Sequence, residues 1–264
     1  MHARRVLVAL IAVPLLYLYV TKLPALFFLI LLMVVSTLAL HEFYRMFRVP
    51  ARLSALGLLC GLMLFAPHVL NVEHPLSVQA MAGVAAFMML ATVRLFMVKD
   101  PMHSLADLAP VAFGLLYIPS LLIPQWLLRI QGIEWIFMLY LAVWMSDTLA
   151  YYIGKNFGTR KLYPEMSPKK TVEGGLGSLV GGTAVGLLFG FFVMPSWGPI
   201  KLGLFGMLIG CITVIGDLVE SMFKRDADVK DSGALIPGHG GVLDRFDSIL
   251  FAGPALYFMK QAFA

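Results

Sequence analysis

The chain has 264 residues, of which 60% are hydrophobic and only 13% are charged, with a formal net charge of +5. Soluble globular domains carry about 25% charged residues, so this composition, with a mean hydropathy of +0.86, excludes an ordinary water-soluble domain. The two cysteines, Cys60 and Cys211, each lie inside an apolar run, and we interpret both as small core residues. No nucleic-acid partner is expected.

Apolar runs of near membrane-spanning length recur along the whole chain and predict an all-α fold, a multi-pass transmembrane helical bundle. The first run follows an arginine pair and resembles a signal peptide, but no clean cleavage site follows it, so we expect an uncleaved first helix. The first two runs are short and could form a tilted hairpin, which leaves the count at nine or eight. The nine expected spans are 6–20, 25–40, 53–70, 77–98, 108–129, 133–153, 177–194, 202–219 and 248–262.

The basic residues predict the orientation of these spans. With the N-terminus in the cytoplasm and nine alternating spans, 16 of the 20 Lys and Arg residues fall at inner ends, and one span more or fewer would remove this bias. The charged loops 154–176 and 220–247 are therefore expected to face the cytoplasm together. Both belong to a C-terminal part, 131–264, which forms one integrated membrane domain with the N-terminal part, 1–130.

Residues 221–248, SMFKRDADVKDSGALIPGHGGVLDRFDS, hold nine of the 35 charged residues of this apolar chain. Two further acids, Asp147 in WMSDTLAYY and Asp217 in VIGDLVES, lie inside predicted spans near their inner ends. Charged groups inside a bilayer are expensive and are usually functional or paired. The charges therefore indicate a site where the two loops converge.

The spacing of these residues is typical of a metal–phosphate site. One predicted helix carries four polar residues on a single face, Asp217, Glu220, Ser221 and Lys224. A second acidic pair, Asp244 and Asp247, precedes the last span, and the Gly-rich loop 237–241 lies between the two groups. Glycines let successive backbone N–H groups turn toward an anion, and Mg²⁺ binds one or two carboxylates while it bridges phosphate oxygens.

Each feature also has an interpretation without chemistry. Asp147 could pair with a basic residue of a neighbouring helix, and a charged loop could serve only as a topology signal. The basic stretch 155–175 could bind anionic lipid head groups. His239 alone would be a structural hydrogen-bonding residue, and His41 and Glu42 look like an interfacial helix end. The coincidence of all these features on one side favours the metal–phosphate site.

The stretch 221–247 resembles the signature of the phosphatidate cytidylyltransferases, also called CDP-diacylglycerol synthases. Upstream, SDTLAYYIGKNFGTRKL, SPKKTVEGGLGS and GDLVESMFKR resemble family segments in the expected order. The resemblance covers the second half of the chain by motif and the first half by span pattern only. The matching residues are Ser221, Lys224, Arg225, Lys230, Asp231, Pro237, His239, Gly240, Gly241, Asp244, Arg245 and Asp247.

The resemblance implies an enzyme that transfers the cytidylyl group of CTP to phosphatidic acid in the lipid bilayer, giving CDP-diacylglycerol and pyrophosphate. A phosphatidate oxygen would attack the α-phosphorus of CTP in line, so positioning and charge neutralisation would supply most of the catalysis. Mg²⁺, alone or with a second cation, would be held by Asp217 and Asp244, with Asp247 close behind. The residues expected to neutralise phosphates are Lys224, Arg225, Lys169 and Lys170.

The resemblance also implies roles for the other motif residues. His239 with Gly240 and Gly241 would shape the phosphate-binding turn. Arg245 would either bind substrate or brace Asp217 or Asp247. Substrate-binding residues by motif are Ser221, Lys230 and Asp231, with Asp147 and Ser146 as walls of the site near the cation. No aromatic residue stands out for cytosine recognition.

Three other classes of protein compete with this interpretation. A transporter would have related halves, but here the charged residues cluster after residue 146. A CDP-alcohol phosphotransferase would need its own motif, which this chain lacks. A non-catalytic scaffold would be expected to lose its metal ligands, yet all three aspartates are present. We therefore expect an active enzyme in a bacterial inner membrane, with its site facing the cytoplasm and, by family resemblance, a homodimeric assembly.

Overall fold

The computed structural model describes residues 17–97, 100–233 and 240–263, which are almost entirely helical, as predicted. A backbone in lipid must satisfy its hydrogen bonds internally, which favours helices. Within the described ranges, seven helical segments are long and apolar enough to cross a membrane. They are Ala25–Met46, Ala51–Val69, Pro75–Met97, Ser104–Gln131, Ile133–Phe157, Val172–Phe192 and Pro199–Asp226.

Among the described residues between 25 and 131, the first half of the chain forms six helices. They are α2 (Ala25–Met46), α3 (Ala51–Met63), α4 (Ala66–Val69), α5 (Pro75–Met97), α6 (Ser104–Tyr117) and α7 (Pro119–Gln131). The expected span 108–129 is divided between α6 and α7 because Pro119, at the first position of α7, has no N–H to continue the α6 hydrogen bonds. This break places Tyr117 at the end of α6.

The second half holds α8 (Ile133–Phe157), β1 (Lys161–Tyr163), β2 (Ser167–Thr171), α9 (Val172–Phe192), η1 (Pro195–Trp197), α10 (Pro199–Asp226) and α11 (Leu243–Phe263). The two short strands pair antiparallel and were not expected from the sequence. Helix α10 continues past its expected end at residue 219, and α11 starts before its expected beginning at 248. The helical face expected from Asp217 to Lys224 is therefore confirmed, and Asp244, which lies within the expected loop 220–247, is also helical.

The expected number of nine spans and the cytoplasmic N-terminus stay predictions. The first expected span, 6–20, lies almost wholly outside the described residues. The last, 248–262, lies within α11, which is not among the seven apolar segments. Charges at Asp244, Arg245 and Asp247 lower the apolar character of the start of this helix.

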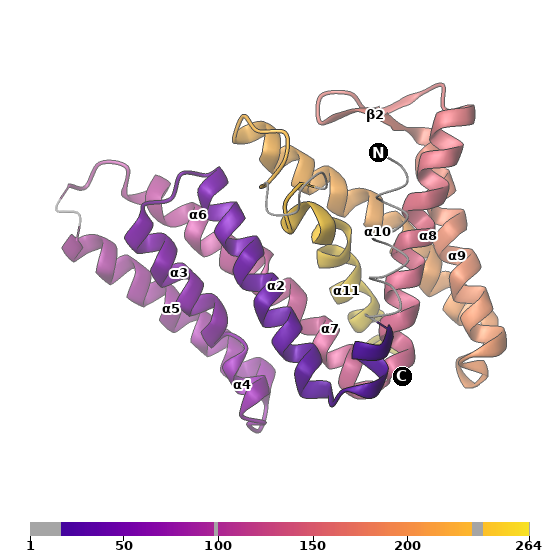
Figure 1. Ribbon diagram of the computed structural model, residues 1–264, viewed down its shortest axis with the longest axis horizontal. Coiled ribbons are helices and arrows are strands. Elements are labelled where there is room, and N and C mark those ends of the chain that lie inside the picture. The colour runs from indigo at the N-terminus through magenta and orange to yellow at the C-terminus, as the bar shows by residue number, and fades with distance from the viewer. Residues whose placement is uncertain (1–16, 98–99, 234–239, 264) are drawn as a thin grey trace.

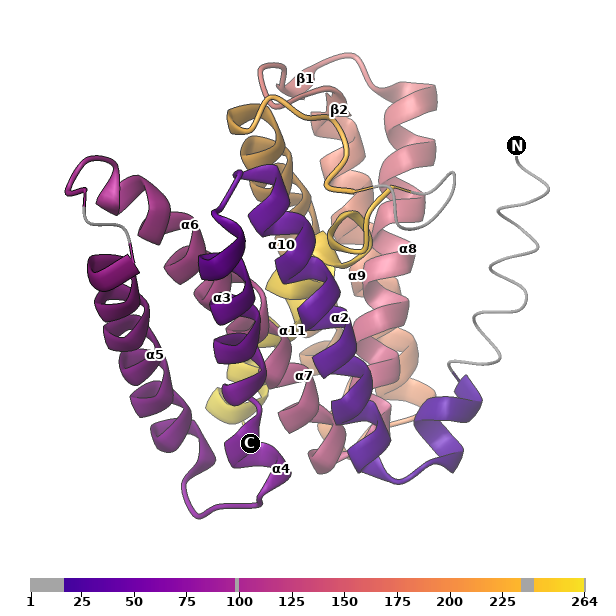
Figure 2. The same cartoon turned by 60° about the vertical axis from the view of Figure 1, so that its left-hand side comes forward.

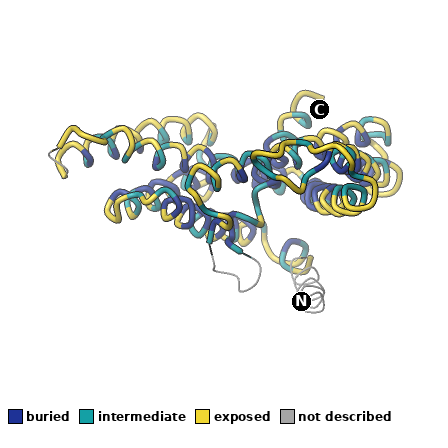
Figure 3. Tube along the Cα trace, turned by 90° about the horizontal axis from the view of Figure 1, so that it is seen from above, coloured by how far each residue is buried: buried dark blue, intermediate teal, exposed yellow. Residues whose placement is uncertain are grey.

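The helices form two groups on either side of a central layer. In Figure 1, α3 and α5 lie on one side, α8 and α9 on the other, and α2, α7 and α11 between them. Figure 2 shows the β1–β2 hairpin, the C-terminal end of α10 and the start of α11 at the same end of the bundle. Exposed residues follow the outer helices in Figure 3, above all α5, where Met81 is 72% and Phe96 74% exposed. A large apolar outer surface of this kind suits contact with lipid.

Helices α8, α9 and α10 pack with their backbones in close contact. A Cβ atom on Gly182 of α9 would collide with the carbonyl oxygen of Gly206 in α10, so only glycine allows this approach. Buried hydroxyls join the three helices: Ser146 of α8 donates to the Ser178 carbonyl oxygen at 2.9 Å, and Ser178 donates to that of Gly210 at 2.8 Å. The helices that carry Asp147 and Asp217 are thus held firmly together.

Candidate active site

A cavity of about 630 Å³ opens at the hairpin end of the bundle, between α8, the hairpin, α9, α10 and α11. Both charged loops identified in the sequence contribute to it, as predicted. Four aspartates and four basic residues lie among the lining residues, so charges of both signs surround the same space. They are Asp147, Asp217, Asp244 and Asp247, with Lys155, Lys169, Lys170 and Arg245.

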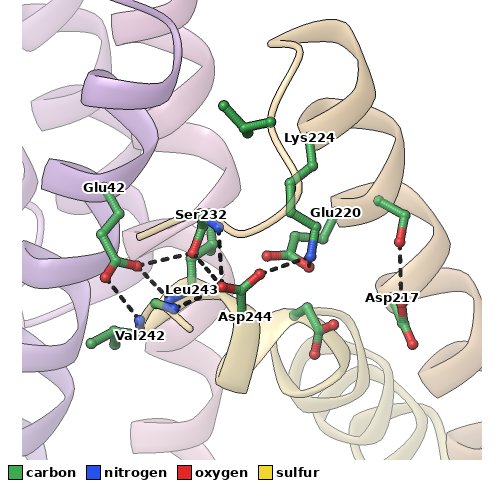
Figure 4. A network of polar contacts seen from close by, with 12 residues as sticks. Glu42, Asp217, Glu220, Lys224, Ser232, Val242, Leu243 and Asp244 are labelled. Atoms are coloured by element: carbon green, nitrogen blue, oxygen red, sulfur yellow. Dashed lines mark hydrogen bonds and ion pairs between the residues drawn. The ribbon is translucent and has the colours of Figure 1, made fainter. Parts of the chain in front are cut away.

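The polar face of α10 is confirmed and joins the site to α11. Lys224 lies between two carboxylates, with its Nζ 2.6 Å from Oε2 of Glu220 and 2.8 Å from Oδ1 of Asp244 (Figure 4). The side chain of Glu220 is fully buried and that of Lys224 is 12% exposed. Ser221 donates to Oδ1 of Asp217 at 3.3 Å. The lysine therefore neutralises a buried carboxylate and fixes the start of α11.

Asp244 lies in the first turn of α11, and four hydrogen-bond donors hold its side chain. Besides Lys224, its Oδ2 accepts hydrogen bonds from the N–H of Ser232 at 3.0 Å, the Ser232 hydroxyl at 3.0 Å and the Gly241 N–H at 2.7 Å. Burial alone would raise the pKa of Asp244, but the bonds from Lys224 and Gly241 outweigh it and hold the pKa below its ordinary value. Asp244 is therefore an anion with its oxygens already oriented.

The glycine turn before α11 serves Asp244 directly. Gly240 has a φ of +81°, in the left-handed region that favours glycine, and a Cβ there would lie 2.7 Å from Oδ2 of Asp244. The Gly241 N–H, which the sequence suggested for phosphate binding, donates to Asp244 in this structure. A phosphate-binding role for the turn stays a prediction, and His239 lies outside the described residues.

Glu42 of α2 also belongs to this network. The sequence pattern had suggested only that Glu42 lies at an interfacial helix end. Its side chain accepts hydrogen bonds from the N–H groups of Val242 and Leu243, both at 2.9 Å, and from the Ser232 hydroxyl at 3.1 Å (Figure 4). Glu42 is 3% exposed. It therefore caps the N-terminus of α11 from a helix 200 residues earlier in the chain, where a negative charge is favourable.

Asp217 faces the other side of the cavity and contacts the hairpin. Its Oδ2 lies 2.7 Å from Nζ of Lys170 in β2, which is an ion pair between helix α10 and the charged loop 154–176. Asp247 accepts a hydrogen bond from the Ser248 N–H at 2.6 Å and lines the cavity together with Asp147. These two acids complete the carboxylate cluster of the site.

The donor set suits Mg²⁺, which prefers carboxylate and phosphate oxygens. Asp217, Asp247 and Asp147 could supply such oxygens from three different helices. Within ranges 17–97, 100–233 and 240–263, however, no three His, Cys, Asp or Glu side chains already surround a common point for a metal ion. Asp217 and Asp244 instead each contact a lysine. A metal ligated by one or two carboxylates and by substrate phosphates fits this arrangement.

Several residues of the sequence motif lie away from the cavity. Arg225 donates to the Val229 carbonyl oxygen at 3.1 Å and orders the turn after α10. Lys230 and Asp231 are exposed and are not among the lining residues. Ser146 is fully buried between α8 and α9, so it acts in helix packing. Substrate contacts by Arg225, Lys230 and Asp231 therefore stay predictions.

These features define a class: an integral membrane protein of packed helices, with a cavity lined by carboxylates and lysines at one end of the bundle. The sequence places the chain within that class. It matches the Cytidylyltransferase family over residues 3–263, nearly its whole length, and it belongs to that family.

Proteins named phosphatidate cytidylyltransferase are similar to this chain. That of Staphylococcus haemolyticus (strain JCSC1435) is 33% identical over 256 residues, which cover 95% of this chain and 94% of the relative. That of Bacillus subtilis (strain 168) is 45% identical over 133 residues, 50% of this chain and 49% of the relative. That of Synechocystis sp. is 48% identical over 119 residues, 45% of this chain and 40% of the relative. In the last two alignments the chain spans half or less of the relative's length.

Proposed function

We propose that this protein is a membrane nucleotidyltransferase that converts CTP and phosphatidic acid to CDP-diacylglycerol and pyrophosphate. One observation carries the proposal: the cavity brings the acids of α8, α10 and α11 together with the lysines of the hairpin, in a chain of the Cytidylyltransferase family. A transporter or a scaffold would need no such convergence of carboxylates and cations. The names of the relatives support the choice of substrates.

The nucleophile of this reaction is a phosphatidate oxygen that is already anionic, so the protein needs no strong general base. It must instead align two negatively charged groups and offset their repulsion. Lys169 and Lys170 lie on the hairpin above the cavity and can pair with the triphosphate. Arg245 lines the same cavity from α11 and can face the lipid phosphate. Binding and charge neutralisation therefore fall to residues of both charged loops.

Mg²⁺ fits the oxygen ligands of the site, with Asp217 and Asp247 as ligands from facing helices and Asp244 held nearby. The cation would supply charge stabilisation for the leaving pyrophosphate. Lys170, which contacts Asp217 in this structure, would be available to neutralise phosphate if Asp217 held the cation. Lys224 keeps its position because two carboxylates hold it.

The placement in the membrane is also part of the proposal. We infer that the cavity faces the cytoplasm of a bacterial inner membrane, where CTP is present, because basic residues gather at this end of the bundle. Labelling of a Lys161→Cys variant from one side of the membrane, with a reagent that cannot cross it, tests this orientation. The homodimer implied by the family resemblance is tested by chemical cross-linking in native membranes.

Purified full-length protein in detergent, with CTP, phosphatidic acid and Mg²⁺, tests the reaction itself. We expect CDP-diacylglycerol and pyrophosphate in equal amounts, no product with ATP or with EDTA, and almost none from Asp217→Asn or Asp244→Asn. Asp226→Asn, an exposed acid at the end of α10, is the matched control and should keep full activity. Folded wild-type protein that forms no product with any divalent cation would refute the proposed function.

A further inference from the structure

One wall of the cavity is a face of α8 that carries an aromatic ring. Five residues of α8 line the cavity, Asp147, Ala150, Tyr151, Gly154 and Lys155, and their spacing places them on a single helix face. Along this face the acid comes first, then a stretch without charge, then the lysine. Among the described lining residues, Tyr151 is the one aromatic side chain, and it is 58% exposed.

Uncharged residues of two further elements line the same cavity. They are Leu162 of β1 and two glycines at the start of α9, Gly174 and Gly175. A Cβ on Gly154 would lie 3.4 Å from the Cα of Gly174, so the two helices touch there, whereas a Cβ on Gly175 would meet no atom within 4 Å. The cavity wall is therefore open at Gly175 and bounded by small residues there, which suits a flat ring.

The distance from Tyr151 to the acids suits a nucleotide. Tyr151 follows Asp147 by one helical turn, a rise of about 6 Å along α8. A ribose separates the base of a nucleotide from its α-phosphate, so a phosphate near Asp147 and Asp217 would place the base at about this height. Nζ of Lys155 lies 5.8 Å from the Tyr151 ring centroid, a cation–π contact that helps to orient the ring.

We propose that Tyr151 is the stacking platform for the nucleobase, and that Leu162, Gly174 and Gly175 form the other side of this subsite. The inference rests on the proposed function and assigns the part of the site that recognises the base. An acyl chain is a poorer occupant, because Lys155 and Lys169 line the same cavity and a base has polar edges that can face them. Stacking tolerates any base, so the platform supplies affinity and leaves the choice of base to other groups.

The neighbouring tyrosine provides a matched control. The ring of Tyr152 is 57% exposed and lies against that of Tyr151, with centroids 5.4 Å apart, but Tyr152 is not among the lining residues. Three variants of the full chain in detergent are compared with the wild type: Tyr151→Ala, Tyr151→Phe and Tyr152→Ala. Equilibrium dialysis measures binding of CTP, dCTP and inorganic tripolyphosphate, and steady-state assays measure KM for CTP and for phosphatidic acid.

Loss of a base-stacking ring weakens binding by about tenfold. We expect that loss for Tyr151→Ala with both CTP and dCTP, with tripolyphosphate binding and the KM for phosphatidic acid unchanged. Tyr151→Phe keeps the ring and should bind as the wild type does, as should Tyr152→Ala. Three results for Tyr151→Ala would each overturn the inference: tripolyphosphate binding that is weakened as much as CTP binding, a raised KM for phosphatidic acid, or normal CTP binding. Wild-type protein that does not bind CTP would instead overturn the proposed function.

Discussion

The carboxylate of Glu42 should be essential for stability because of what it accepts. Both of its oxygens are occupied: Oε1 by the Val242 N–H, and Oε2 by the Leu243 N–H and the Ser232 hydroxyl. Glutamine keeps the shape of the side chain but has only one acceptor oxygen. In Glu42→Gln, an NH₂ group must face one of these donors, and in Glu42→Ala the two backbone amides lose their acceptor, while the Ser232 hydroxyl can still donate to Asp244.

The cost can be worked out from the number of donors. A buried polar group without a partner costs about 1–3 kcal/mol, so the two backbone amides alone make Glu42→Ala about 2–6 kcal/mol less stable. One misplaced amide makes Glu42→Gln about 1–3 kcal/mol less stable. A chain of this size loses about 2–4 °C in Tm per kcal/mol. The alanine variant should therefore melt at least about 4 °C below the wild type.

Thermal unfolding in detergent, followed by the loss of monodisperse protein, measures these shifts. His41→Ala is the matched control, because His41 is the exposed neighbour of Glu42 on the same helix. Product formation should fall with stability in the Glu42 variants, since Ser232 bonds both Glu42 and Asp244. If Glu42→Ala has the same Tm as the wild type, Glu42 does not cap α11, and the reasoning is wrong.

Three further outcomes follow from packing, charge and metal. Gly182→Ala should lower Tm by several degrees because its methyl group would collide with the Gly206 carbonyl oxygen, whereas Gly83→Ala, with no atom within 4 Å of the added Cβ, should not. Lys224→Met should cost about 3–5 kcal/mol by leaving Glu220 buried without its cation, and adding Glu220→Gln should restore part of the lost Tm. EDTA should abolish product formation and Mg²⁺ should restore it, with no change in Tm under the same assay conditions if the cation acts in the reaction and not in folding.

Much of this architecture could be predicted because the bilayer restricts what a chain can do. Long apolar runs mark helices, and the i, i+3, i+4, i+7 spacing from Asp217 to Lys224 places these residues on one face, as the structure confirms. The convergence of the two charged loops was also predicted and is confirmed by the cavity that Lys170 of one loop and Asp244 of the other both line. The family was identified from the motif that spans the end of α10 and the start of α11, and the match over residues 3–263 confirms it.

Contacts between distant segments could not be predicted from local patterns. Glu42 sits at the end of an apolar run, where a solvated position and a buried one give the same sequence pattern. Nothing near Glu42 indicates that Val242 and Leu243 would need an acceptor. Tyr151 was one aromatic residue among many in membrane spans, and only its place among the cavity-lining residues separates it from Tyr152.

The hydrogen bonds between Glu42 and the start of α11 have a consequence for the synthesis of the protein. The two partners are separated by 200 residues, and ribosomes add about 5–20 residues per second. The amide partners of Glu42 are therefore synthesised about 10–40 s after Glu42 itself. During that time α2 holds an acid without its final donors, so this part of the fold is incomplete until the start of α11 has been made.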